Sequence, residues 1–280
     1  MTMRGRLALL GAIAILAAGC GSSAPTTLLA KVTAAGKIVV STDANYAPQS
    51  LQKADGSYEG FDIDVATEIA KRVGNLKVEF TTPDWAIITA GGWGGRFDMS
   101  VGSMTVTADR QKVLDFSDPY YFTPAQMTVS KASGITTLDG LKGKTVCVGE
   151  ATTYLDWLGG KKLDFGTLSP TTTPPAGVQA VTQKTDQNCP QLWGAGRNDF
   201  EGWLTSSTAV AGALDAGLPL IKVGDPVYYE PLAVAIDKSG PADAEFLAAV
   251  TKAVKDMHAD GTLKAFSMKW FKVDLTAGPM

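Results

Sequence analysis

Short runs rich in β-branched residues alternate along the chain with segments of helical periodicity. The strand-like runs include residues 37–43, 76–82 and 97–103, with the sequences KIVVSTD, LKVEFTT and FDMSVGS. Strands that alternate with helices favour an α/β fold with mainly parallel sheets, because parallel strands need a crossover between them. The chain has 280 residues. That length is sufficient for two modest domains.

Two helical segments carry a clear apolar face. The first is expected to begin at Asp62, as an aspartate cap, and to pack one face on a sheet through Val65, Ile69 and Val73. The second is expected to open near Pro241 and to end at Gly261, followed by a short final helix over residues 264–271. The expected buried stripe of the second helix is Phe246, Val250, Val254 and Met257.

The N-terminus has the features of a secretory signal. Arg4 and Arg6 precede an apolar run over residues 7–18 that is too short to span a bilayer as a stable helix. The sequence LAAGC at residues 16–20 is typical of a bacterial lipobox, so we expect residues 1–19 to be removed and Cys20 to be lipidated, with palmitate as an acyl group. The alternative is a plain cleaved signal with an incidental cysteine. Residues 20–36 are then a lipidated N-terminus and tether that holds the protein outside the cytoplasm at the cell membrane.

Two cysteines remain after Cys20. Cys147 lies in a predicted strand, TVCVG, and Cys189 follows a predicted helix start at Asp186. An even number of cysteines in an oxidising compartment predicts a disulfide, with two buried free thiols as the alternative. Closing a loop of about forty residues would stabilise the fold by about 3 to 4 kcal/mol in the chain-entropy model.

An arginine stands where local helix physics does not favour one, in the run SMTVTADRQKVLDFSDPYY over residues 103–121. Thr107 is suited to cap a helix that begins just before Arg110. A cation there opposes the positive end of the helix dipole, at a cost of about 0.3 to 1 kcal/mol. A bound anion would offset this cost, and a guanidinium fork suits a carboxylate, with Ser103 and Thr105 as nearby hydroxyl donors. The alternative is a solvated surface arginine.

This run closely resembles the carboxylate-binding segment of the bacterial extracellular solute-binding proteins of family 3, which serve polar amino acid ABC transporters. Upstream, STDANYAP at residues 41–48 and DGSYEGFDIDVATEIAKRVG at residues 55–74 resemble that family's first strand, loop and helix. Downstream, residues 135–154 resemble the opening of its second lobe and residues 259–271 its closing helix. The blocks follow the family's order over most of residues 37–272.

The resemblance implies a two-lobed, type II periplasmic-binding-protein-like fold. Each lobe would be a mainly parallel sheet flanked by helices, and the chain would cross between lobes near residues 121–125 and 227–232. Lobe one would be discontinuous, combining residues 37–122 with 232–280, and residues 126–226 would form lobe two. We expect a monomer.

The resemblance also implies a solute pocket between the lobes. Arg110, Ser103 and Thr105 would hold the polar end of the solute, and Thr153 would reach its carboxylate from the opposite lobe. For Thr153 the alternative is simple helix capping. Glu150 is placed to face the cleft, although a solvated glutamate is equally consistent with the sequence.

The family's side-chain subsite matches three further residues. Asp43 and Tyr46 stand at the positions of an acid and an aromatic wall, and Trp85 stands at a second aromatic wall that faces the side chain of the solute. Two aromatic faces can clamp an aliphatic stem or lie beneath a cation. The alternative for Trp85 is a place in the apolar core.

One departure from the family concerns the solute's α-ammonium. The family usually places an aspartate five residues after the one that corresponds to Asp199, and the count here reaches Leu204. Ser206, Ser207 or a shift in the register of the strand would compensate for the missing aspartate. A carboxylate whose amine is placed differently, or absent, remains an alternative.

These features predict a substrate-binding lipoprotein of an ABC importer, with a membrane permease as its partner and no catalytic residue or cofactor. Scattered basic residues argue against nucleic acid. The single histidine, His258, leaves no histidine-based metal cluster or triad. The alternatives are an extracytoplasmic enzyme that resembles cyclohexadienyl dehydratase and uses a cleft acid, and the ligand-sensing subunit of a membrane receptor.

Overall fold

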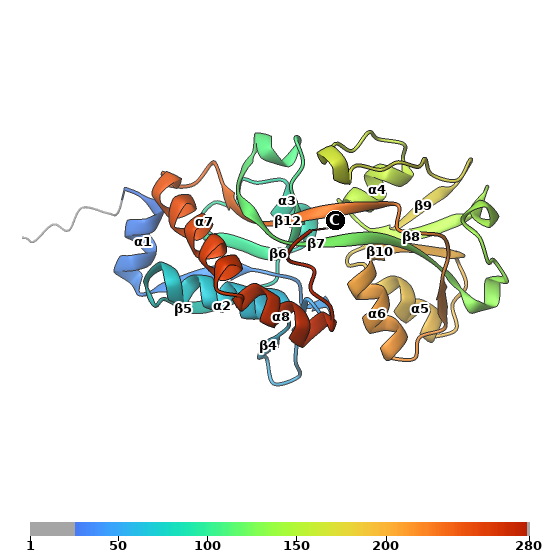
Figure 1. Ribbon diagram of the computed structural model, residues 1–280, viewed down its shortest axis with the longest axis horizontal. Coiled ribbons are helices and arrows are strands. Elements are labelled where there is room, and N and C mark those ends of the chain that lie inside the picture. Colours follow the sequence, from blue (N-terminus) through green and yellow to red (C-terminus); the bar gives the residue numbers. More distant parts are fainter. Residues whose placement is uncertain (1–25, 279–280) are drawn as a thin grey trace, which may run out of the picture.

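The computed structural model describes residues 26–278. Two lobes lie side by side and are joined by two long strands, β7 (Leu114–Ser130) and β12 (Tyr228–Asp237), which run from one lobe into the other (Figure 1). Helices in this part of the chain are too short or too polar to cross a bilayer. The predicted signal segment and Cys20 lie outside the described residues.

A single sheet passes through both lobes. Within residues 26–278 it has nine strands in the order β5-β1-β6-β12-β7-β10-β8-β9, and β11 pairs with β7. The strands at each end pair in parallel, whereas β7 and β12 pair antiparallel at the centre. The remaining strands are β1 (Lys37–Ser41), β5 (Lys77–Thr81), β6 (Met99–Thr105), β8 (Thr145–Gly149), β9 (Gln179–Gln183), β10 (Gly202–Ser206) and β11 (Leu220–Lys222). The predicted α/β class with mainly parallel lobes and two crossings is therefore confirmed.

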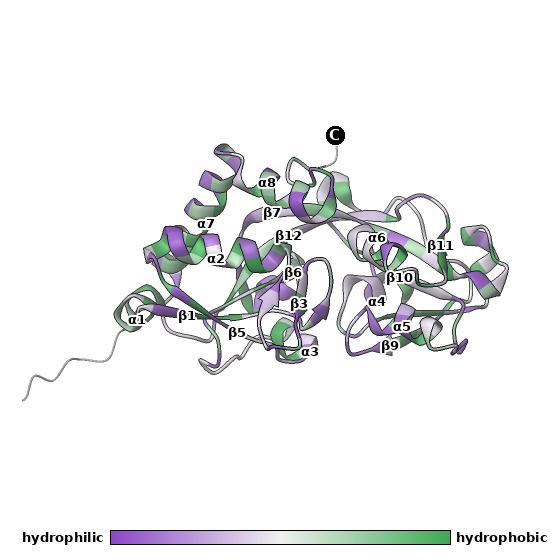
Figure 2. Cartoon of the chain, turned by 90° about the horizontal axis from the view of Figure 1, so that it is seen from below, coloured by the Kyte–Doolittle hydropathy of each residue, from purple (hydrophilic) through white to green (hydrophobic). Residues whose placement is uncertain are grey.

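Helices cover the sheet in both lobes. In lobe one they are α1 (Leu28–Ala35), α2 (Phe61–Gly74), α3 (Trp85–Thr89), α7 (Ala244–Ala259) and α8 (Thr262–Phe271). In lobe two they are α4 (Thr153–Leu158), α5 (Asn188–Gly194) and α6 (Ser207–Asp215). A small second sheet in lobe one contains β2 (Asn45–Tyr46), β3 (Ser50–Gln52) and β4 (Tyr58–Glu59). Polar and apolar residues are interspersed along the outer helices (Figure 2), as expected for helices that bury one face.

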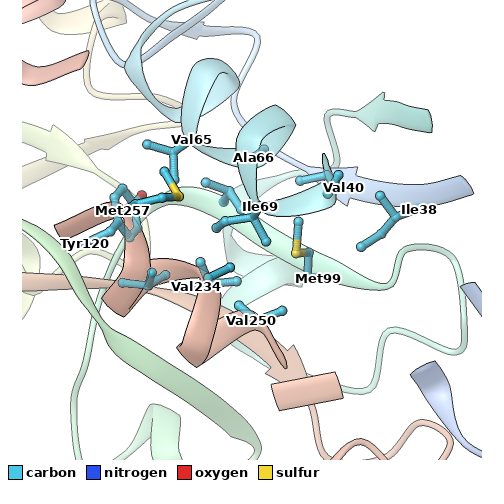
Figure 3. Close-up of a cluster of buried hydrophobic side chains, with 14 of the residues drawn as sticks. Ile38, Val40, Val65, Ala66, Ile69, Met99, Tyr120, Val234, Val250 and Met257 are labelled. Carbon is cyan, nitrogen blue, oxygen red and sulfur yellow. The ribbon is translucent and has the colours of Figure 1, made fainter. Parts of the chain in front are cut away.

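The core of lobe one draws on both ends of the described chain. Its buried residues come from positions 28–121 and again from 232–263. Figure 3 shows Val65 and Ile69 of α2 beside Val250 and Met257 of α7, so the predicted apolar stripes of these helices meet in one cluster. We therefore propose to assign residues 37–122 and 232–280 to lobe one. The apolar clusters of lobe two lie between residues 125 and 228, and we propose residues 126–226 as its extent.

Three local expectations are corrected by the structure. Asp62 does not cap α2, because the helix begins at Phe61 after Gly60 and the buried Asp62 carboxylate accepts hydrogen bonds from Ser103 and Tyr120. Residues 28–35, expected to be part of the tether, instead form α1, whose Leu28 and Val32 pack into the core of lobe one. The predicted helix near Pro241 begins slightly later, at Ala244.

The predicted disulfide between Cys147 and Cys189 is present. It joins β8 to α5 within lobe two, and both residues are fully buried. The loops that follow β8 and precede α5 lie at the edge of the cleft. The disulfide therefore links the two segments that carry Thr153 and Asp186.

Candidate functional site

A cavity lies between the lobes. Its walls come from both lobes and from the strand β12, which joins them. All eight residues predicted to bind a solute line this cavity: Asp43, Tyr46, Trp85, Ser103, Thr105, Arg110, Glu150 and Thr153. Their role in binding remains a prediction, because lining a cavity does not by itself establish a contact with a solute.

Arg110 is positioned by a single tight turn. The Thr107 hydroxyl accepts a hydrogen bond from the Arg110 backbone N–H at 3.1 Å, as a cap does. The expected helix is only a 3₁₀ turn over Arg110–Lys112, however, so the argument from a helix dipole does not apply here. Tertiary contacts, rather than the turn, decide where the guanidinium points.

The guanidinium of Arg110 is buried at the wall of the cavity. The residue is 8% exposed, and its Nη1 and Nη2 donate to the backbone carbonyls of Thr105 and Ala151, each at 2.9 Å. Its centre lies 5.5 Å from the ring of Trp85, within reach of a cation–π contact. Burial lowers the pKa of Arg110. Among residues 26–278 no carboxylate forms an ion pair with it, which leaves a buried cation at the cavity wall.

Two of the predicted hydroxyl donors are already engaged by a carboxyl group that the sequence did not indicate. Thr105 and Thr153 both donate to Oε1 of Glu230, the former at 2.7 Å, and Tyr154 donates to Oε2 at 2.5 Å. Glu230 is 2% exposed and lies on β12. Burial raises its pKa, against the opposing effect of these hydrogen bonds and of the nearby charge of Arg110.

The hydroxyl of Ser103 is also engaged. It donates to Asp62 at 2.8 Å and lies 2.6 Å from the hydroxyl of Tyr121. Ser103 has a φ of 56°, a left-handed conformation that is uncommon for residues with a side chain. Its backbone N–H donates to Tyr120. Ser103 therefore contributes to the cavity wall with its hydroxyl turned toward a buried acid.

Asp186 provides a second carboxyl group that the sequence prediction missed. Its Oδ1 accepts from the backbone N–H of Gly149 at 2.6 Å and its Oδ2 from Thr205 at 2.8 Å. Burial raises the pKa of Asp186 to about 7, and no cation of the described chain pairs with it. Leu204, the residue reached by counting, is fully buried in an apolar cluster of lobe two and does not line the cavity.

The end of the cavity predicted to face the solute's side chain holds Asp43 and Tyr46. Asp43 accepts a hydrogen bond from the backbone N–H of Asn45 at 2.7 Å, and burial raises its pKa. The Tyr46 hydroxyl donates to Ser206 at 2.9 Å, across the two lobes. Ser206, one of the residues expected to compensate for the missing aspartate, therefore supports an aromatic wall and does not line the cavity.

Ion pairs across the cleft rim hold the lobes in contact. Lys184 of lobe two lies 3.0 Å from Asp84 of lobe one and 2.8 Å from Glu150. Lys161 of lobe two lies 2.8 Å from Asp109 of lobe one. Glu150 lines the cavity, and its carboxylate pairs with Lys184 at the rim. These pairs describe a closed arrangement of the cleft.

Signals for the two missed acids exist in the sequence. Glu230 is a charged residue within the run YYEPLAVAI, which otherwise has the composition of a buried strand. Asp186 follows the strand β9 near its C-terminal end, where α/β proteins place ligands. Both acids lie outside the motifs that carried the resemblance.

Other features of the site are more limited. Within residues 26–278, no group of three or more His, Cys, Asp or Glu side chains has the arrangement of a metal site. The proline- and threonine-rich segment at residues 168–177 packs beside α4, where Trp157 donates to the carbonyl of Thr172 at 3.3 Å. It lies outside the cavity.

Comparisons with known proteins agree with this geometry. The sequence model of the bacterial extracellular solute-binding proteins, family 3, matches residues 38–273. The chain is 33% identical to the L-cystine-binding protein TcyJ of Escherichia coli K12, over 97% of each chain. It is 29% identical to the histidine-binding periplasmic protein of Salmonella typhimurium, over 86% of this chain and 90% of that one. The ancestral amino acid-binding protein AncCDT-1, described as a precursor of cyclohexadienyl dehydratase, superimposes with a TM-score of 0.72 at 32% identity, covering 88% of this chain and all of that one.

Proposed function

The chain belongs to the bacterial extracellular solute-binding proteins, family 3, and from this premise we propose that it captures an amino acid by closing its lobes. The captured solute would then pass to the membrane permease of an ABC importer. The observation that carries the proposal is a buried, unpaired cation, Arg110, which shares one cavity with the buried carboxyl group of Asp186.

Arg110 would bind the carboxylate of the solute. Burying a cation away from a counter-ion is costly unless hydrogen bonds and an opposite charge compensate. The backbone carbonyls of Thr105 and Ala151 satisfy part of the guanidinium, but they carry no full negative charge. A solute carboxylate would supply that charge through the remaining N–H groups, in a charge-assisted hydrogen bond.

Asp186 would accept the α-ammonium of the solute, in place of the aspartate that the family usually carries at the position of Leu204. The hydrogen bonds from Gly149 and Thr205 fix both carboxylate oxygens of Asp186 at the cavity wall. Asp43 lies close enough to Asp186 to raise its pKa further. A cationic group placed between these two acids would favour the ionised form of both.

Closure of the lobes would couple capture to delivery. Arg110 belongs to lobe one and Asp186 to lobe two, so a solute that contacts both residues has those contacts together only in the closed form. Binding therefore shifts the population toward that form, and a permease that recognises the closed lobes receives loaded protein.

Lipidation of Cys20 would hold the protein at the outer side of the membrane. The support is the sequence LAAGC at residues 16–20 after a short apolar run. Metabolic labelling with a palmitate analogue tests this point. The label is expected on the wild-type protein and not on Cys20→Ala, and equal labelling of both would contradict it.

A thermal-shift screen with single amino acids, including L-cystine, L-histidine, L-arginine and L-glutamine, tests the function. A bound solute raises the unfolding temperature by mass action. At least one amino acid is expected to stabilise the wild type and to have no effect on Arg110→Ala or Asp186→Asn. The exposed Arg197, which pairs with Asp199 on the surface, provides the matched control Arg197→Ala. A full response in Arg110→Ala would exclude the assigned pocket.

A second candidate function is an enzyme that removes water from its substrate. The observation in its favour is the presence of two buried carboxyl groups in the cavity, Asp186 and Glu230, whose pKa values are raised by burial, as a general acid requires. Such an acid would protonate a departing hydroxyl group. Incubation of the pure protein with prephenate or arogenate separates the two functions. An aromatic product would support the enzyme, and absence of product would exclude this dehydratase activity.

A further inference from the structure

Glu230 lies near Arg110, the residue to which the proposed function assigns the carboxylate of the solute. Its Oε1 accepts from Thr105 of lobe one and from Thr153 of lobe two, and its Oε2 accepts from Tyr154 of lobe two. Thr105 and Thr153 are two of the donors assigned to the solute. The residue lies on β12, at the joint between the lobes, and is only 2% exposed.

A solute carboxylate and Glu230 would therefore share one cation. A carboxylate bound to Arg110 would lie near Thr105, whose carbonyl accepts from Arg110 and whose hydroxyl donates to Glu230. Two carboxylates that share a buried site do not both remain ionised, since their repulsion raises the pKa of one of them strongly. The solute carboxylate has the guanidinium as its direct partner, so the group that becomes neutral is Glu230.

The groups that face Glu230 are consistent with this assignment. They are Arg110 from the 3₁₀ turn, Thr105 from β6, Thr153 and Tyr154 from α4, Tyr228 from β12, Tyr46 from β2 and Asp186 from the loop after β9. Among these described neighbours only Arg110 carries a positive charge. Burial raises the pKa of each of the three tyrosines, so they remain neutral. If a solute carboxylate bound beside an ionised Glu230, no second cation among these neighbours would neutralise the added negative charge.

We propose that Glu230 takes up one proton from solvent when the carboxylate of an amino acid binds at Arg110, so that solute and proton are captured together. The protonated carboxyl group then donates a hydrogen bond to the solute carboxylate, where an ionised one would repel it. When the solute leaves, the proton returns to solvent. This inference rests on the proposed function. It makes Glu230 the residue that determines in which protonation state the pocket binds the solute.

The sign of the pH dependence follows directly. Because the complex holds one more proton at Glu230 than the free protein does, affinity falls as pH rises above the pKa of Glu230 in the free protein, approaching about tenfold per pH unit. Asp186 acts in the opposite sense, because it must be ionised to accept an ammonium group. Its pKa is about 7, so its contribution is nearly complete by pH 8.

Calorimetric titration at pH 8, in two buffers with different ionisation enthalpies, measures the protons taken up per solute. The probes are L-glutamine and L-arginine, whose side chains do not titrate between pH 6 and 8. Wild type is expected to take up as much as one proton more than Glu230→Gln, which keeps the size of the side chain and binds with a flatter pH profile. The α-ammonium groups of the probes titrate equally with both proteins. Glu79→Gln, on the surface beside Lys37, is expected to match the wild type.

Equal proton uptake by wild type and Glu230→Gln would overturn the inference. So would proton release that disappears in Glu230→Gln, because this result would place a cationic group of the solute against Glu230. If Glu230→Gln does not fold, the wild type decides alone at pH 8: proton uptake well above the share of the solute's α-ammonium supports the inference, and uptake equal to that share overturns it. Failure of both probes and of the other amino acids of the thermal-shift screen to bind either protein would instead overturn the amino acid proposal, and this inference with it.

Discussion

Arg110 is linked to Ala151 across the cleft, by a hydrogen bond of 2.9 Å from Nη2 to the backbone carbonyl. Nη1 of the same guanidinium donates to Thr105 in its own lobe. One side chain therefore contacts both lobes and borders the cavity, which makes it sensitive both to closure and to the occupant. A lysine at this position would retain the charge but lose the planar fork that makes the two contacts at once.

We predict that Arg110→Lys weakens amino acid binding by about 10- to 150-fold, the cost of losing a charge-assisted hydrogen bond of about 1.5 to 3 kcal/mol. The fold should remain intact, because the side chain lies at a cavity and not in an apolar core. Calorimetry with L-glutamine and L-arginine measures the affinity, and Arg197→Lys is the surface control. Unchanged affinity in Arg110→Lys would show that the planar guanidinium of Arg110 does not contribute to solute binding.

A second prediction concerns Asp62, which lies behind the cavity wall. Its carboxylate accepts from Ser103 and Tyr120, and burial raises its pKa to about 7, above the usual 3.8 of an aspartate. Between these two values the folded protein binds more protons than the unfolded chain, so Asp62 reduces stability as pH rises through this window. The variant Asp62→Asn does not titrate there. Relative to it, the wild type should lose up to about 4 kcal/mol between pH 4 and pH 7.5.

Urea unfolding at several pH values between 4 and 7.5 measures this difference. The exposed Asp225 provides the control Asp225→Asn, which should follow the wild type at each pH. Parallel stability curves for wild type and Asp62→Asn would mean that Asp62 titrates alike in the folded and unfolded states, contrary to the prediction.

The disulfide supports a third prediction. Cys147 lies two residues before the end of β8, and Cys189 follows Asp186 by three residues. Replacement of both cysteines by alanine should lower the free energy of unfolding by about 3 to 4 kcal/mol. It should also weaken solute binding, because the loops that carry Thr153 and Asp186 lose their covalent link. In the wild type, alkylation detected by mass spectrometry should require a reductant. The double variant should bind equally well with and without that reductant.

Most of the fold could be predicted from the sequence, because local patterns and tertiary packing agree in it. The stripes Val65–Ile69 and Val250–Met257 lie where their periodicity indicates, and β1 and β5 cover most of the expected runs. Asp62 is an instructive exception. An aspartate at a helix start is usually exposed and caps the backbone, but two hydroxyl groups from distant strands bind this one instead, and no local pattern reveals such partners.

The site could be predicted only as far as its motifs extend. The eight residues taken from the sequence all line the cavity, whereas Asp186 and Glu230 come from segments without a motif. Both are single acids whose importance depends on the groups that surround them in the fold, and this is a property of three-dimensional placement. The same limitation explains Leu204. Counting along the chain identifies a position, but a shift of one residue in a strand turns a side chain to the opposite face.

The fourth prediction tests that explanation of Leu204. The side chain of Leu204 is fully buried in the apolar cluster of lobe two, while that of its neighbour Thr205 donates to Asp186. If position 204 were part of the solute site, Leu204→Asp would restore the family's usual acid and strengthen amino acid binding. The structure predicts the reverse. A carboxylate placed among apolar side chains must either lose its charge or disrupt the packing, and we expect a loss of several kcal/mol of stability.

The control Leu204→Ala separates the effect of charge from that of volume. Truncation of a buried leucine typically costs about 2 to 5 kcal/mol, so both variants should be less stable than the wild type. The loss of stability in Leu204→Asp should be larger at pH 8 than at pH 5, because the new carboxylate is more easily protonated at pH 5. Urea unfolding at both pH values measures the order, and thermal shifts with L-glutamine and L-arginine measure binding. A stable Leu204→Asp protein with increased affinity would place this residue at the ammonium group and remove Asp186 from that role.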